Sequence, residues 1–163
     1  MYPLDRTDRV LLHTLQDDAR ATVKELGAAC GLSPSAAHER VRRLQRAGVI
    51  TGHHATLDPG AVGIGLQALI QVQLRQHSRE DVVAFRAHAL SLPETLSIAH
   101  VTGAMDFLVR VGVRDSDHLR DLALDAFTTR PEVARLETAI VYEHVLATRW
   151  PIAIPDEAAG AAV

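Results

Sequence analysis

The 163-residue sequence has a single cysteine and no long apolar run. Because Cys30 stands alone, an internal disulfide and a cysteine-rich zinc site are excluded. No amino-terminal segment joins positive charge to an apolar stretch. The charge-free stretch 59–74 is interrupted by three glycines, a proline and three glutamines, which makes it too polar to span a bilayer. These absences predict a cytoplasmic protein with no membrane association.

Motifs of catalysis are also missing. The nine histidines have no metal-ligand spacing such as HExxH. The sequence contains no Ser/His/Asp elbow, no glycine-rich phosphate loop and no carboxylate pair. We therefore expect no enzymatic activity, no bound metal and no cofactor.

Positive charge is concentrated in the first third of the chain. The whole sequence has a net charge of −3, yet residues 1–50 hold eight basic and six acidic residues, a net charge of +2. The remaining residues hold nine basic and fourteen acidic residues, a net charge of −5. Phosphate attraction supplies most sequence-independent affinity for DNA. This distribution favours an amino-terminal part that binds nucleic acid.

Residues 22–46 predict two short helices with a break between them. Gly31 can adopt a positive φ and end the first helix. Ser33 can cap the second helix, and Pro34 fits its first turn. This layout is that of a helix-turn-helix DNA-binding motif, with the second helix as the recognition helix.

The recognition helix has an apolar side and a charged side. Ala37, Val41 and Leu44 recur at i, i+4 and i+7, which predicts one buried stripe. The opposite side points away from the core and carries Ser35, Glu39, Arg42, Arg43 and Arg46. A plain solvated helix would look similar, because Glu39 and Arg43 have the spacing that supports isolated helices.

The flanking segments complete a winged helix-turn-helix domain over residues 1–57. A helix that starts within residues 4–8 brings the number of helices to three, enough to close a small core. Its apolar seam consists of Leu12, Leu15 and either Val10 or Leu11. After the recognition helix, residues 49–57 predict a strand, which we interpret as the wing.

Helix geometry predicts two sets of DNA contacts. Base contacts are expected from Ser33, Ser35, Ala36 and Glu39. Phosphate contacts are expected from Arg40, Arg42, Arg43 and Arg46. His53 and His54 on the wing either contact the DNA backbone or lie on a plain surface strand.

A second domain is expected at residues 66–149, after a Pro/Gly-rich linker at 58–65. Alternation and turn signals predict strands at 66–74, 95–101, 107–113 and within 133–148, with helices that begin after residues 78 and 115 or 116. The fold class is therefore α+β, with a ferredoxin-like βαββαβ module whose two helices lie on one face. Residues 150–163 are expected to form a carboxy-terminal tail, disordered from 158.

The other face of this sheet has no helix to cover it. Its expected residues, among glutamines, are Leu69, Leu108, Ala139, Val141 and Val145. A partly apolar sheet surface invites a partner, so we expect a homodimer through the sheets. A two-fold pair of recognition helices would suit an inverted repeat in double-stranded DNA, with half-sites about 34 Å apart.

Several ordered segments resemble the Lrp/AsnC family of feast/famine transcriptional regulators. They are residues 4–8, 15–20, 31–34, 39–44, 48–50, 57–59, 101–103 and 106–107, within a similarity that covers 4–149. The resemblance implies a sequence-specific DNA-binding regulator that forms dimers and larger rings such as an octamer. It also implies that DNA binding or assembly responds to a small-molecule effector, commonly an amino acid.

The same resemblance implies an effector site between dimers, near a Gly-x-x-Asp turn. Its candidate residues are Thr102, Gly103, Asp106, Thr138 and Ile140. Exposed backbone N–H groups of a turn can bind a carboxylate, and Asp106 can pair with an ammonium group. Alternatively, Gly103 serves only the turn geometry and Asp106 bonds only its own hairpin.

Two other functions remain open on the sequence alone. One is a stand-alone metabolite-binding regulatory subunit of an enzyme, in which the amino-terminal helices mediate protein contacts. The other is a DNA architectural protein that responds to no effector. The arginines of the recognition helix separate the first alternative from a DNA-binding protein.

Overall fold

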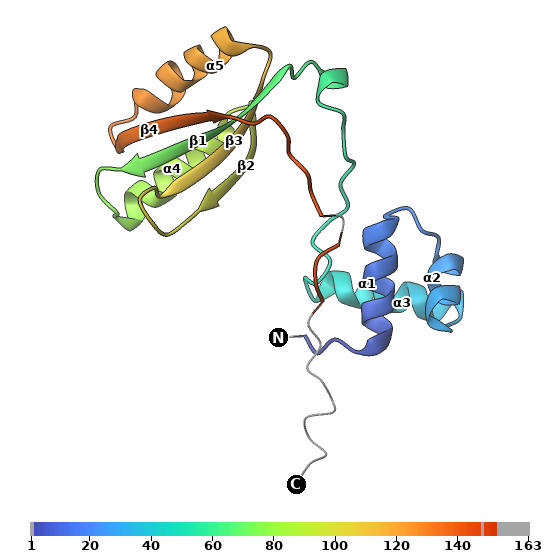
Figure 1. Cartoon of the computed structure of the whole chain (residues 1–163). Coiled ribbons are helices and arrows are strands. Elements are labelled where there is room, and N and C mark those ends of the chain that lie inside the picture. The colour runs from blue at the N-terminus through green and yellow to red at the C-terminus, as the bar shows by residue number, and fades with distance from the viewer. Residues whose placement is uncertain (1, 148, 153–163) are drawn as a thin grey trace. The chain divides into compact units, whose positions relative to one another are not determined.

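The computed structural model describes residues 2–147 and 149–152 (Figure 1). Its contacts divide the chain into two units: residues 1–55 with those from 145 onward, and residues 56–144. The expected disordered segment from 158 lies outside the described residues, as does most of the expected tail. Within the described residues, no helix is long and apolar enough to cross a membrane.

The first unit contains three helices, α1 (Arg6–Asp17), α2 (Val23–Cys30) and α3 (Pro34–Arg46). Reciprocal capping boxes, in which the cap and the third helical residue bond each other's backbone N–H, begin α1 and α2. Gly31 ends α2 with φ of 69°, and the Ser33 hydroxyl accepts the Ala36 N–H at the start of α3. The predicted helix-turn-helix is confirmed.

A small core holds these helices together. Leu11, Leu26 and Ala37 are fully or nearly fully buried, one from each helix. Of the two alternatives for the apolar seam of α1, Leu11 is the buried residue, whereas Val10 is 38% exposed. On α3 the predicted stripe is also confirmed, because Ala37 and Leu44 are buried and Val41 packs against the core.

The expected wing is wrong in this structure. Residues 49–57 form bends and coil, and none of them belongs to a strand. A strand needs a neighbour for its backbone N–H and C=O groups, and none of the segments that the structure describes is paired with this one. Apolar and β-branched residues alone therefore do not make a strand here.

The second unit is the predicted antiparallel α/β module. Its elements are β1 (Leu66–Leu74), α4 (Arg79–Ser91), β2 (Thr95–His100), β3 (Phe107–Val113), α5 (Ser116–Leu122) and β4 (Val133–Ile140), with a 3₁₀ turn at Gly60–Val62 and a π-helical turn at Ala123–Thr128. The strand order is β2-β3-β1-β4, and all three pairings are antiparallel. Strands β1 and β3 coincide with the predicted ranges.

Both helices cover the same face of the sheet. Every second residue of β1, from Ala68 to Leu74, is buried, and side chains from α4 and α5 join the same core cluster. The Phe85 ring of α4 lies 4.7 Å from that of Phe107 on β3 and 6.1 Å from that of Phe127. Burial of each ring contributes about 2–3 kcal/mol to the free energy of folding. This cluster therefore holds the helices against the sheet.

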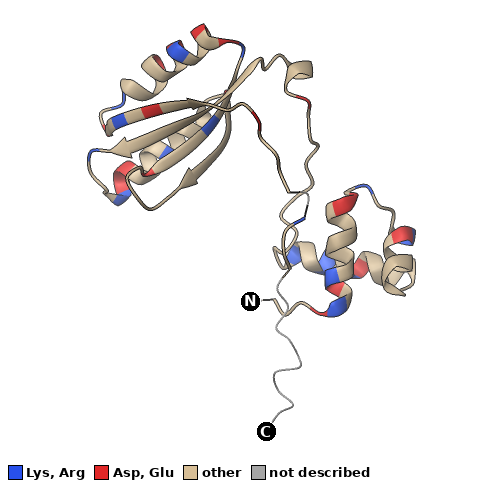
Figure 2. Ribbon diagram, viewed as in Figure 1, with Lys and Arg blue, Asp and Glu red and all other residues tan. Residues whose placement is uncertain are grey.

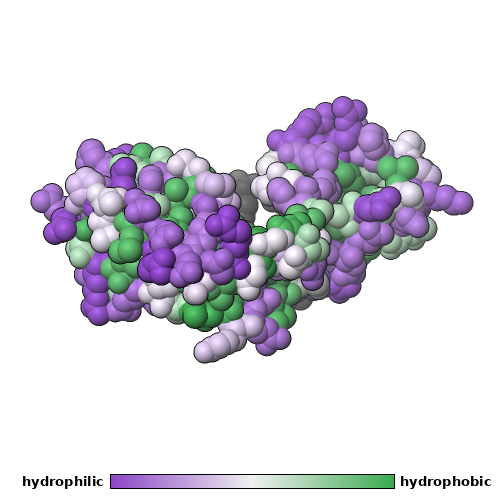
Figure 3. Space-filling view, turned by 90° about the horizontal axis from the view of Figure 1, so that it is seen from above, coloured by the Kyte–Doolittle hydropathy of each residue, from purple (hydrophilic) through white to green (hydrophobic). Residues whose placement is uncertain are grey.

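The opposite sheet face is uncovered in the single chain. Leu69 lies opposite Arg110 on β3 and Ala139 on β4, and Gln71 lies opposite Leu108. These positions therefore share a face, as predicted. Val145 does not join them, because it lies beyond the end of β4. Leu69 and Leu108 are half-buried and Ala139 is exposed. Figure 3 shows apolar side chains (green) among hydrophilic ones (purple) on the surface of the chain.

Candidate DNA interface and effector site

The predicted base-contacting residues lie at the amino-terminal end of α3. Ser33, Ser35, Ala36 and Glu39 are all exposed. The Ser33 hydroxyl is already used as the helix cap and also lies 3.2 Å from the Ser35 hydroxyl. This end of α3 presents small side chains to solvent, so a nucleic acid can approach the helix backbone closely.

Arg40 differs from its neighbours, because its guanidinium points toward α1. Its Nη1 atom donates to Asp5 at 2.5 Å and to Asp8 at 2.9 Å, and Asp8 is 1% exposed. Arg40 joins α3 to the capping box of α1, so it is not free to bind phosphate in this structure. In this structure Arg40 forms a structural ion pair, and its phosphate contact stays a prediction.

This ion pair shifts the pKa values of Asp5 and Arg40. Burial alone would raise the pKa of Asp5, but the Asp8 N–H and the Arg40 guanidinium outweigh it and lower that pKa. Hydrogen bonds to Asp5 and Asp8 raise the pKa of Arg40. The charged forms are thus favoured in the folded state, and the start of α1 is fixed against α3.

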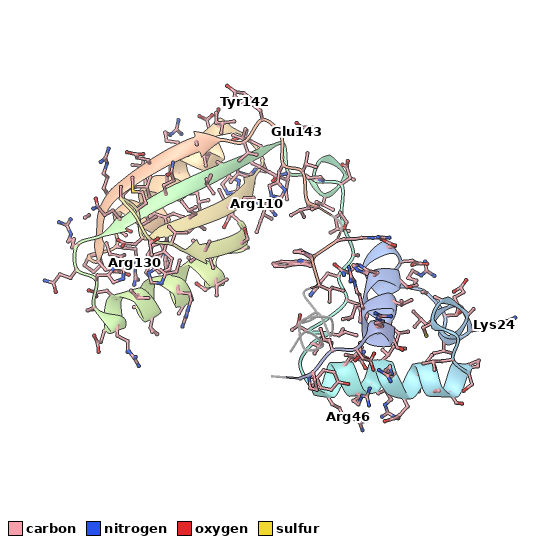
Figure 4. The ribbon with its side chains drawn as sticks, turned by 60° about the horizontal axis from the view of Figure 1, so that its bottom comes forward. Lys24, Arg46, Arg110, Arg130, Tyr142 and Glu143 are labelled. Atoms are coloured by element: carbon pink, nitrogen blue, oxygen red, sulfur yellow. The ribbon has the colours of Figure 1, made fainter. Side chains whose placement is uncertain are left out.

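Three arginines remain on the outer side of α3 (Figure 2). Arg46 extends away from α1 (Figure 4) and lies 2.6 Å from Glu39, with both side chains mostly exposed. Arg43 stacks over the Tyr2 ring, 5.6 Å from its centroid. Arg42 is exposed and makes no ion pair with any described residue. Arg42 and Arg46 can meet a phosphate backbone without loss of a buried partner, whereas Arg43 Nη2 also lies 4.0 Å from the buried carboxylate of Asp8.

The two histidines of the expected wing are also exposed. His53 and His54 follow the helix-turn-helix in an extended coil, not in a strand. The imidazole of His54 folds back over Gly52, where an added Cβ would lie 3.0 Å from Nε2. They are available to solvent and therefore to DNA.

The candidate effector turn follows β2. Gly103 has a φ of 125°, which side-chain-bearing residues rarely adopt, so the turn requires glycine there. Asp106 uses both of its carboxylate oxygens inside the protein: Oδ2 accepts the Leu74 N–H at 2.7 Å, and Oδ1 lies 3.0 Å from His77 Nδ1. The carboxylate thus links the hairpin to the end of β1.

An aromatic stack beside Asp106 was not expected from the sequence. The His77 ring lies 5.3 Å from the His100 ring, which in turn lies 4.7 Å from the buried Phe107 ring. The hydrophobic alternation of β3 locates Phe107, but nothing in the sequence pairs residues 77 and 100. The stack closes one side of the effector turn.

Thr138 and Ile140 lie apart from this turn within one chain. Both are exposed residues of β4, opposite Ile70 and Ala68 of β1. The turn follows the other end of the β1–β3 ladder, where Val72 pairs with Phe107. The five candidate effector residues therefore form two groups. Thr102, Gly103 and Asp106 lie in the turn before β3, and Thr138 and Ile140 lie on β4, on the other side of β1 and further along it.

Arg110 is a further polar residue that sequence reasoning missed. It lies on the uncovered sheet face, where its Nη1 donates to His144 at 2.5 Å (Figure 4). Its Nε atom is buried and has no hydrogen-bond partner among the described residues. In the described part of the chain, no three His, Cys, Asp or Glu side chains gather as a metal site would require.

Two family models match the two units in order. The model described as an AsnC-type helix-turn-helix domain matches residues 4–45, and the one described as an Lrp/AsnC ligand binding domain matches residues 67–151. The first match contains α1, α2 and nearly all of α3. The second contains the sheet except for Leu66, the first residue of β1.

Known proteins are similar over most of the chain. The HTH-type transcriptional regulator AldR of Mycolicibacterium smegmatis is 39% identical over 87% of this chain and 83% of its own length. A feast or famine regulatory protein of M. tuberculosis in complex with L-methionine superposes with a TM-score of 0.82, at 34% identity over 93% of this chain and 99% of that one. The L-methionine complex of a transcriptional regulator of Neisseria meningitidis gives a TM-score of 0.81, at 30% identity over 88% and 93%.

Proposed function

Because the chain belongs to the Lrp/AsnC family of DNA-binding transcriptional regulators, we propose that the outer side of α3 is its DNA-binding surface. The observation that carries this proposal is the division of the α3 arginines. Arg40 is held by two carboxylates, whereas Arg42, Arg43 and Arg46 are exposed on the outer side. A helix with this arrangement can lie in the major groove without uncovering its own core.

The proposed contacts fall into two classes. Base edges are met by the amino-terminal turns of α3, through Ser33, Ser35, Ala36 and Glu39. Arg42, Arg43 and Arg46 contact phosphates, and His53 and His54 contact the adjoining DNA backbone. The Glu39–Arg46 pair, 2.6 Å apart, opens when either residue engages DNA, and its exposure makes that opening inexpensive.

The second unit is proposed to bind an amino acid and so to modulate DNA binding or assembly. L-methionine is bound in two of the similar solved structures, which supports an α-amino acid as the class of effector. The proposed site consists of Thr102, Gly103, Asp106, Thr138 and Ile140. Because these residues form two groups in one chain, a complete site requires a second copy.

Assembly is proposed to use the uncovered sheet face. A homodimer through this face would cover Leu69, Leu108 and Ala139. Dimers then join into a larger ring such as an octamer. The two-fold pair of α3 helices fits an inverted repeat with half-sites about 34 Å apart.

Duplex-binding measurements over a range of salt concentrations test the DNA surface. Arg42→Ala should weaken binding to every sequence and reduce the salt slope by about one. Ser35→Ala should change the preferred sequence, as read by selection from random duplexes. Arg120→Ala, which removes an exposed cation from α5, is the matched control. Unchanged affinity and slope in Arg42→Ala would refute the assignment of this face.

Thermal unfolding with added L-methionine, L-leucine or L-alanine tests the effector site. A ligand that binds only the folded state must raise the melting temperature. An increase that disappears in Asp106→Ala supports the proposed site. No increase with any amino acid would favour an effector-independent DNA architectural protein.

A further inference from the structure

The carboxyl end of α1 has an unfavourable charge pattern when taken alone. The helix ends at Asp17, its cap is Asp18, and its last turn has no basic residue. The carboxyl end of a helix carries partial negative charge, so carboxylates are disfavoured there and cations are favoured. The last turn itself supplies no cation, so a cation from another part of the chain would stabilise this end.

Arg149 supplies that cation. Its Nε donates to Asp17 Oδ1 at 2.5 Å and its Nη2 donates to Asp17 Oδ2, a bidentate pair between residues 132 positions apart. The Arg149 hydrogen bonds lower the pKa of Asp17, and the same contact raises the pKa of Arg149. Beside it, the backbone N–H of Trp150 donates to the side-chain oxygen of Gln16.

A partly apolar hollow lies next to the Gln16–Trp150 contact. A hollow of about 510 Å³ is lined by Leu12 and Leu15 of α1, by Ile50 after α3, and by residues 150–152. Ile152 is half-buried beside it. The described residues from 145 onward are accordingly part of the first unit and not of the sheet unit.

We infer that residues 149–152 form a clip that docks on the carboxyl end of α1 and completes the DNA-binding unit from the far end of the chain. The chain leaves the DNA-binding unit after α3 and rejoins it at this clip, so the sheet unit is connected to it at both ends. The Arg149–Asp17 pair is largely exposed, with side-chain exposures of 55% and 44%. Docking is therefore readily reversible, and the clip can be released without unfolding the helices.

Trp150 is the single tryptophan of the chain, so its fluorescence anisotropy reports directly on the clip. In the docked state the indole tumbles with the DNA-binding unit, and in the released state it moves on a faster time scale. Asp17→Asn removes one charge far from Trp150 in sequence and should shift the docking equilibrium by about two- to fivefold. Anisotropy should fall, and amide exchange at Trp150 should become faster by the same factor.

Two variants control the experiment. Arg120→Gln removes a comparable exposed ion pair on α5 and should leave both signals unchanged. The exchanged pair, Asp17→Arg with Arg149→Asp, should recover part of the anisotropy. Wild-type signals in Asp17→Asn, or failure of the exchanged pair to recover any anisotropy, would overturn the clip. Neither measurement uses DNA or an amino acid, so the result is independent of the proposed function.

Discussion

Arg40 of α3 donates a 2.9 Å hydrogen bond to Asp8 of α1, a carboxylate that is 1% exposed. The pair joins the recognition helix to the first helix of the DNA-binding unit. Arg42, only two residues further along α3, points to solvent. Two arginines of one helix thus have different tasks, one structural and one available for DNA.

Replacement of Arg40 by methionine should destabilise the DNA-binding unit. Removal of the guanidinium leaves the buried Asp8 charge with only Arg43, 4.0 Å away, as a cationic partner, at a cost of about 3 kcal/mol. Urea denaturation of the full chain, followed by circular dichroism of the helices, measures this loss. Arg42→Met is the matched control and should keep the wild-type midpoint while it weakens DNA binding. The opposite pattern would mean that Arg40 contacts phosphate.

Acid should weaken the contact between Arg40 and Asp5. The folded-state pKa of Asp5 lies below its ordinary value of 3.8, so the folded state favours the charged carboxylate. The stability that this carboxylate contributes is complete above that ordinary value and is lost as the pH falls through the lowered pKa. Asp5→Asn keeps an N-cap oxygen and removes the charge. We therefore expect the urea midpoint of Asp5→Asn to fall less steeply than that of wild type between about pH 5 and pH 2.

Helical spacing could have distinguished the two arginines before the structure was known. Arg40 lies three residues after Ala37 and four before Leu44, which places it on the side of the buried stripe. Arg42, Arg43 and Arg46 have no such relation to the stripe. The partner of Arg40 could not be read in the same way, because Asp8 is 32 residues away and its position depends on how α1 packs.

The sheet unit was predictable for a related reason. Alternation in β1 and the glycine turn before β3 are local signals, and they fixed the order and most bounds of its strands. The prediction of a wing strand was wrong because a strand depends on a neighbouring strand that local sequence does not specify. Likewise, the bonds of Asp106 to Leu74 and His77 join segments about thirty residues apart and required the structure.

Asp106→Ala should destabilise the sheet unit even without a ligand. The substitution leaves the Leu74 N–H without its acceptor, which costs about 1–3 kcal/mol for a buried donor. If Asp106 served only to bind an ammonium group, ligand-free stability would not change. Thermal unfolding in the absence of amino acids measures the difference. Asp117→Ala, which removes a 77% exposed carboxylate from α5, should leave the melting temperature nearly unchanged.

A charge placed on the uncovered sheet face should prevent assembly. Leu108 lies on that face beside Gln71, so Leu108→Glu would put a carboxylate at the centre of the proposed homodimer. An unpaired charge in a desolvated interface costs several kcal/mol, which predicts a dissociation constant raised at least about tenfold. Light scattering coupled to size-exclusion chromatography measures the mass of the particle.

Val83→Glu provides the comparison for this experiment. Val83 is 47% exposed on α4, on the helical side of the module, so its substitution adds the same charge away from the proposed interface. We expect Val83→Glu to retain the wild-type mass and Leu108→Glu to shift to a smaller particle with unchanged circular dichroism. Equal masses for wild type and Leu108→Glu would exclude this face as the contact between copies.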